Sequence, residues 1–156
     1  MQDRKNVFIS HYGNDDEHIG KLKDLMQTKG YELRNSSIDL TKPNNASDPN
    51  YVRQLLKSRI EWAGTTLVLI GPETHKREWV DWEIETSNKC GNRIVGIFIH
   101  GATDSNIPDA LEKFGDSLVG WNSSRIADAI DGAADTWETA SGEIREPRHT
   151  QPRIDC

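Results

Sequence analysis

The chain has 156 residues, a formal net charge of −6 and a mean hydropathy of −0.72. This length suits one domain, which can bury a single hydrophobic core but not two. The acidic balance argues against a sequence-independent grip on nucleic-acid phosphates, which requires a basic surface. No apolar stretch approaches the roughly 18–20 residues that span a bilayer. We therefore expect neither a nucleic-acid partner nor a membrane partner.

Two cysteines, Cys90 and Cys156, are too few for a disulfide framework or a zinc cluster. The polar N-terminus runs directly into a short apolar segment and does not have the pattern of a signal peptide. The five histidines show no metal-ligand spacing. These features predict a protein of the reducing cytoplasm without a metal site.

Five short apolar runs, each bounded by turn or cap residues, predict the strands. Residues 65–70 and 93–99 are nearly continuous and rich in branched side chains. That pattern is typical of strands buried on both faces of a parallel sheet. The other predicted strands are residues 7–9, 31–33 and 118–121.

Amphipathic helices are predicted between these strands. The first has an apolar stripe that ends at Gly30, and the second begins with Pro49 at its first helical position. The third covers about residues 78–90, a short fourth covers residues 108–114, and Asn122 caps a fifth. The alternation predicts an α/β fold, a flavodoxin-like three-layer sandwich with a five-stranded parallel sheet and right-handed crossovers.

The regular pattern ends after Gly132. Residues 133–156 contain Trp137 and Ile144 but are otherwise mostly polar or charged, and two prolines disfavour regular structure. We predict one domain over residues 5–132 and a polar C-terminal tail over residues 133–156, which is either docked or free.

In sheets of this type, ligands bind beyond the carboxyl ends of the strands, at the switch in strand order. Four segments are expected there: residues 10–14, 35–49, 71–77 and 100–105. His11 and His100 each follow a predicted strand and are placed to line the site. An ordinary loop histidine is the alternative for each of them.

The third predicted helix has four carboxylates in eight residues, and we expect one of them to face the sheet. At about 100° per residue, Glu83 lies in the middle of the apolar stripe, between Trp79 and Ser87. A carboxylate in that position is costly unless it is paired or used. A structural glutamate and a functional one both stay open. The other three acids, Glu78, Asp81 and Glu85, are expected on other faces of this helix. Glu78 and Asp81 are interpreted as first-turn acids that the helix dipole favours, and Trp82 is expected on the outer side.

Three segments together resemble a TIR-type domain. They are the opening strand N-V-F-I-S-H-Y at residues 6–12, the polar loop at residues 37–50, and G-P-E-T-H leading to W-V-D-W-E-I over residues 71–84. More narrowly, the chain is similar to the TIR-like ThsB family of bacterial Thoeris anti-phage systems. The likeness covers residues 5–132, so the tail lies outside it.

The resemblance implies an NAD glycohydrolase or ADP-ribosyl cyclase, with one helix glutamate, Glu83 by position, as the catalytic residue. NAD is then the substrate and no cofactor is expected. The implied partners are a downstream effector reached through a diffusible nucleotide product, a phage-derived trigger and further copies of the chain. The substrate-binding positions that we expect from it are Phe8, Ser10, His11, Ser37, Asp39, Thr74 and Trp79. A place in the core is the alternative for Phe8 and Trp79, and for Phe8 it is the favoured one.

The chemistry of NAD suits a single carboxylate. Ordinary glycosidases need a general acid as well, because their leaving group departs as an alkoxide. Nicotinamide leaves a cationic pyridinium as a neutral molecule, so one carboxylate can stabilise the oxocarbenium-like transition state. Two alternatives stay open: a non-catalytic TIR scaffold that assembles through residues 37–49, and an enzyme like the nucleoside deoxyribosyltransferases, which also use a glutamate.

Overall fold

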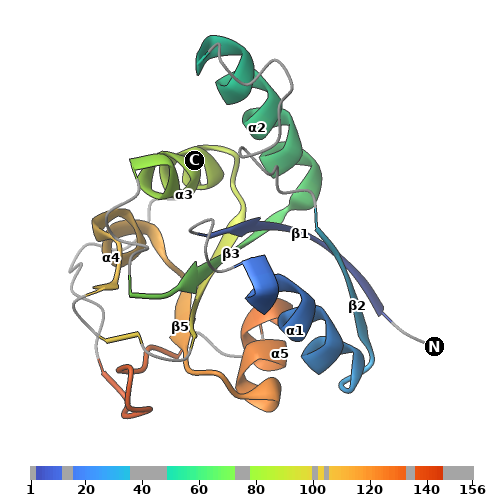
Figure 1. Cartoon of the computed structure of the whole chain (residues 1–156), viewed down its shortest axis with the longest axis vertical. Helices are drawn as coiled ribbons and strands as arrows, with labels where there is room; N and C mark the ends of the chain where they lie inside the picture. The colour runs from blue at the N-terminus through green and yellow to red at the C-terminus, as the bar shows by residue number, and fades with distance from the viewer. Residues whose placement is uncertain are drawn as a thin grey trace.

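The computed structural model describes residues 3–11, 16–35, 49–72, 78–99, 102–103, 106–132 and 136–145. Within these ranges five strands alternate with five helices (Figure 1). The strands are β1 (Asp3–Ser10), β2 (Tyr31–Asn35), β3 (Thr65–Ile70), β4 (Arg93–Phe98) and β5 (Ser117–Val119). The helices are α1 (Asp16–Gln27), α2 (Pro49–Ala63), α3 (Glu78–Lys89), α4 (Asp109–Phe114) and α5 (Ser123–Asp131).

The strands form one parallel sheet in the order β2-β1-β3-β4-β5. The chain moves outward from β1 to β2 and then returns to β3, so the strand order reverses between β1 and β3. This is the flavodoxin-like order, whose ligands bind at that reversal. The predicted fold class is confirmed, and the sheet edge of interest is the carboxyl end of β1 and β3.

Helices cover both faces of the sheet (Figure 1). On one face, α1 and α5 pack on a cluster that includes Val7, Ile9 and Leu67. On the other face, α2, α3 and α4 pack on two clusters that include Phe8 and Val68. Successive residues of a strand point to opposite faces. Ser10, two residues after Phe8, therefore points toward the face that carries α3.

The segment that follows α5 packs on the domain, although the sequence analysis places it in a polar tail. The backbone N–H of Leu118 donates to the carbonyl of Thr136 at 2.9 Å, and the N–H of Glu138 donates to Leu118 at 2.9 Å. These bonds form a parallel bridge beside β5. Trp137 is 4% exposed and belongs to the α3–α4 cluster. Residues 136–145 are thus part of the same packed structure, and residues 146–156 lie outside the described ranges.

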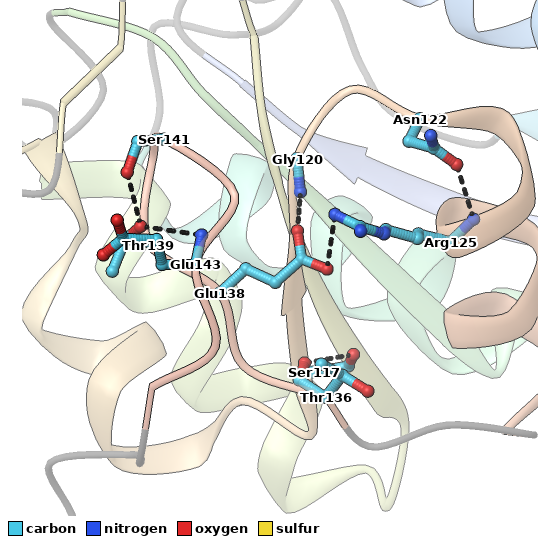
Figure 2. A network of polar contacts seen from close by, with 9 residues as sticks. All are labelled: Ser117, Gly120, Asn122, Arg125, Thr136, Glu138, Thr139, Ser141 and Glu143. Carbon is cyan, nitrogen blue, oxygen red and sulfur yellow. Dashed lines mark hydrogen bonds and ion pairs between the residues drawn. The ribbon is translucent and has the colours of Figure 1, made fainter.

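A buried carboxylate joins this segment to α5 (Figure 2). Glu138 accepts a hydrogen bond from the backbone N–H of Gly120 at 3.1 Å and pairs with Arg125 at 3.2 Å. Arg125 lies in the first turn of α5, where Asn122 accepts its backbone N–H at 3.1 Å, as expected for the predicted cap. The charge of Glu138 is therefore both paired and hydrogen-bonded, which is what a buried carboxylate requires.

The middle of β4 has no room for a side chain. A Cβ atom added at Gly96 would lie 2.6 Å from Leu111 Cδ2 and 2.7 Å from Leu118 Cδ1. We expect Gly96→Ala to lower the free energy of unfolding by about 1–3 kcal/mol, measured by urea denaturation, because added volume strains a packed core.

Gly20→Ala is the matched control, because Gly20 is exposed on α1 with nothing within 4 Å of the new atom. It should stabilise the protein by up to about 1 kcal/mol. Equal effects of the two substitutions would contradict the packing argument.

Candidate active site

Glu83 is buried between α3 and the carboxyl end of β1. Glu83 is only 4% exposed, and its Oε1 accepts a hydrogen bond from Ser10 Oγ at 2.8 Å. Ser10 is the last residue of β1 and is 1% exposed. The structure thus brings together two residues that the sequence analysis assigned to the site, at the reversal of strand order.

The buried face of α3 confirms the predicted orientation of Glu83. Val80, Ile84 and Ser87 are fully buried on the same face, whereas Glu85 is exposed. The hydrogen bond from Ser10 satisfies one carboxylate oxygen in this low-dielectric position, as a buried acid requires. The position of Glu83 is compatible with both a structural and a functional carboxylate.

Asp81 contributes more than a first-turn charge, which is the role that the sequence analysis gave it. Its Oδ1 accepts a hydrogen bond from the backbone N–H of Ala110 at 3.3 Å and so ties α3 to the first turn of α4. Burial raises the pKa of Asp81 above its ordinary value of 3.8, although the hydrogen bond from Ala110 acts in the opposite direction. Asp81 is thus a link between helices.

The raised pKa of Asp81 predicts a pH effect on stability. The folded state holds the proton more tightly than the unfolded state, so this group stabilises the fold at low pH, and the stabilisation is lost as pH rises from 3.8 through the folded-state value. Asp81→Asn keeps an oxygen for Ala110 and removes the charge. We expect its urea midpoint to fall less than that of the wild type as pH rises through that window. Asp128→Asn, on the exposed side of α5, is the control, and identical pH profiles for Asp81→Asn and the wild type would refute the effect.

His11 and Phe8 flank Ser10 in the sequence. His11 is 7% exposed, with its Nδ1 3.2 Å from the carbonyl oxygen of Ile9. Phe8 has no exposed surface and packs with Val52 of α2. Phe8 thus lies in the core, which is the favoured alternative for this residue. The substrate-binding roles of Phe8 and His11 stay predictions.

Trp79 and Trp82 both lie at the contact between α3 and α2. Their rings meet edge to face, with centroids 5.6 Å apart and planes at 82°. The Arg53 guanidinium carbon lies 5.7 Å from the centroid of the Trp79 ring. Trp82 is partly buried against the same cluster as Phe8, so the expectation of an outward Trp82 is wrong. The substrate-binding role of Trp79 stays a prediction.

Several predicted positions lie outside the described residues. They are Ser37, Asp39, Thr74 and His100. Among the described residues, no three His, Cys, Asp or Glu side chains group in a way that could hold a metal ion. No helix within the described ranges is long and apolar enough to cross a membrane.

Two further buried polar residues, which no local sequence pattern predicted, lie at the contact between α3 and the sheet. Thr66 of β3 and Asn92, which precedes β4, are both buried. Thr66 Oγ1 lies 2.7 Å from Ser87 Oγ, and Ser87 donates to the carbonyl oxygen of Glu83 at 2.7 Å. The available signal was a threonine inside a strand that is buried on both faces, where a hydroxyl must find a partner.

The strand order and the helices on both faces of the sheet define an α/β domain of the flavodoxin-like type. The family model described as "Thoeris protein ThsB, TIR-like domain" matches residues 8–104, which is more than half of the chain and includes Ser10 and Glu83. The chain belongs to this ThsB TIR-like family.

A curated relative in Bacillus cereus carries the name "Putative cyclic ADP-D-ribose synthase ThsB1". The two are 29% identical over 104 residues, which is 64% of this chain and 54% of that protein. The chain thus spans about half the length of this relative.

Two solved structures are similar to this fold. A 2-deoxyribosyltransferase from Bacillus psychrosaccharolyticus has a TM-score of 0.56 and 13% identity, over 77% of this chain and 88% of that one. The CMP N-glycosidase BcmB of Clostridium botulinum has a TM-score of 0.49 and 16% identity, over 85% of this chain and 100% of that one. At 13% identity, the first match supports the fold alone.

Proposed function

We propose that this protein is a TIR-family enzyme that cleaves NAD at the bond between nicotinamide and ribose and makes a cyclic or conjugated ADP-ribose signal during phage infection. The observation that carries the proposal is the buried Glu83 carboxylate, held by Ser10 at 2.8 Å where the strand order reverses. The family match over residues 8–104 and the name of the Bacillus cereus relative support it.

Glu83 acts on the charge that develops at the ribose. As the bond from C1′ to the pyridinium nitrogen breaks, its electron pair leaves with neutral nicotinamide and positive charge spreads over C1′ and the ring oxygen. A carboxylate fixed in a site of low dielectric stabilises that charge without reorganising. Ser10 donates to Oε1 and so holds the carboxylate in place before the reaction.

The group that captures C1′ decides the product. A nucleophilic nitrogen or hydroxyl of the same ADP-ribose gives a cyclic product, whereas a second small molecule gives a conjugate and water gives linear ADP-ribose. A hydroxyl or a water forms the new bond to C1′ and loses its proton, whereas a ring nitrogen of the base forms that bond with its lone pair and the base takes up the positive charge. No further cofactor is needed, because NAD supplies both the electrophile and the leaving group.

The proposal extends to the surroundings of the enzyme. The product diffuses in the cytoplasm to a downstream effector, a phage-derived factor acts as the trigger, and copies of the chain associate during activation. The match to the Thoeris ThsB family supports this extension of the proposal.

The test is mass spectrometry of the products formed when the full chain meets NAD and an extract of phage-infected cells. We expect the wild type to release nicotinamide with an ADP-ribose product, and Glu83→Gln to release both at a rate lower by about a hundredfold to a thousandfold. Equal inactivity of both proteins in that extract would overturn the proposal. Phage protection that persists in Glu83→Gln would select the non-catalytic scaffold, and turnover of deoxynucleosides but not NAD would select the deoxyribosyltransferase alternative.

A further inference from the structure

A buried run of polar side chains continues from Glu83 along the contact between α3 and the sheet. Its members are Thr66 of β3, Ser87 of α3 and Asn92 ahead of β4, which are 0%, 0% and 5% exposed. They lie among apolar residues such as Ile84 and Ile94. Buried polar side chains in apolar surroundings destabilise the fold unless they form hydrogen bonds with one another or with the backbone.

The hydrogen bonds of this run have one direction. Ser87 has a single hydroxyl proton and donates it to the carbonyl oxygen of Glu83 at 2.7 Å. Thr66 Oγ1 lies 2.7 Å from Ser87 Oγ, so Thr66 must be the donor of that pair. Asn92 Nδ2 in turn lies 3.4 Å from Thr66 Oγ1 and donates to the carbonyl of Ile60 at 2.8 Å. The donors therefore point from Asn92 through Thr66 and Ser87 to the backbone of Glu83.

Glu83 is consequently attached to the sheet at two points. Ser10 of β1 holds its carboxylate, and Thr66 of β3 holds its backbone through Ser87. The two anchors are on neighbouring strands and on the same face, because Phe8 pairs with Thr66 and Ser10 pairs with Val68. A serine that donates to the carbonyl four residues earlier also bends its helix slightly. The turn of α3 that carries Glu83 is thus fixed against both strands.

We propose that Thr66 and Ser87 are positioning residues for Glu83, which set the place of its carboxylate by holding its helical turn on β3. The inference rests on the proposed function, since it concerns the same carboxylate. Displacement of a reacting group by about 1 Å can cost on the order of a hundredfold in rate. Loss of the Thr66 hydroxyl should therefore lower the rate of the chemical step more than it lowers substrate binding.

Thr66→Val and Thr66→Ser form the matched pair that tests this. Valine keeps the shape of threonine and removes the donor to Ser87, whereas serine keeps the hydroxyl and removes a methyl group. We expect Thr66→Val to lower kcat for NAD about tenfold to a hundredfold with KM within about twofold of the wild type. We expect Thr66→Ser to keep most of the wild-type kcat, even where its melting temperature falls. If Thr66→Val does not fold, Ser87→Ala is measured in its place, because it removes the hydroxyl that joins Thr66 to the backbone of Glu83.

A second readout does not depend on turnover. The carboxyl ¹³C resonance of Glu83, assigned by its loss in Glu83→Gln, reports the titration of this group. We expect its midpoint to move in Thr66→Val and to return toward the wild type in Thr66→Ser.

The inference is overturned if Thr66→Val keeps the wild-type kcat and titration of Glu83, or if both variants lose kcat equally, which would assign the effect to packing. A wild-type protein without Glu83-dependent turnover would instead sink the proposed function, and the titration would then decide the inference alone.

Discussion

Glu83→Gln is expected to lower the rate of NAD cleavage by about a hundredfold to a thousandfold and to leave the fold intact. Glutamine has the same size and keeps an oxygen that can accept the Ser10 hydroxyl, which now lies 2.8 Å from Oε1. What it loses is the negative charge, and with it the stabilisation of the cationic transition state. Initial rates of nicotinamide release in infected-cell extract measure the effect, and thermal unfolding verifies the fold.

Glu85→Gln is the matched control for that experiment. Glu85 is on the same helix, two residues further on, and its side chain is exposed. The substitution Glu85→Gln removes the same charge from α3 without changing the buried site. The rate of NAD cleavage by this variant should therefore match that of the wild type. Equal losses in the two variants would show that the acidity of α3, and not the buried carboxylate, supports activity.

Trp137→Ala is expected to lower the free energy of unfolding by about 3–5 kcal/mol, the largest loss of stability among these variants. Trp137 is 4% exposed and packs with Leu111 and Leu118, and its Cζ2 lies 3.3 Å from where a Cβ of Gly115 would be. The Arg145 guanidinium carbon lies 5.0 Å from the centroid of its ring. Removal of the indole leaves a cavity between Trp137's neighbours in the core. Urea denaturation measures the change.

Trp121→Ala is the control for Trp137→Ala. Trp121 is 37% exposed and meets His18 edge to face at 6.1 Å. Its removal opens little buried volume, so we expect a change within about 1 kcal/mol. Equal stabilities of Trp137→Ala and the wild type would mean that residues 136–145 do not contribute to the folded unit.

Local patterns in the sequence predicted the sheet and the facing of Glu83 well, for a simple reason. β3 and β4 are buried on both faces, so most of their residues are apolar and each run is visible without knowledge of its neighbours. The facing of Glu83 follows from the helical repeat alone, because Val80 and Ile84 mark the inward side of α3.

The missed features depend on contacts between distant parts of the chain. The helical repeat places Trp82 relative to the sheet, but it does not show that α2 lies beside α3 and covers that side as well. Thr66 and Asn92 are 26 residues apart, and neither their direct contact nor the hydrogen bond between Thr66 and Ser87 has a local signature. Trp137 joins β5 through a single bridge, which is too short for an alternating pattern.

That bridge has a consequence for how the sheet can be extended. The outer strand of an open sheet offers unpaired backbone groups to any other extended chain. At β5 the backbone N–H of Leu118 already donates to Thr136, and its carbonyl already accepts from Glu138. A foreign strand would first have to displace Trp137 from its pocket and Glu138 from Arg125. Residues 136–138 therefore protect this margin of the sheet against strand addition by other polypeptides.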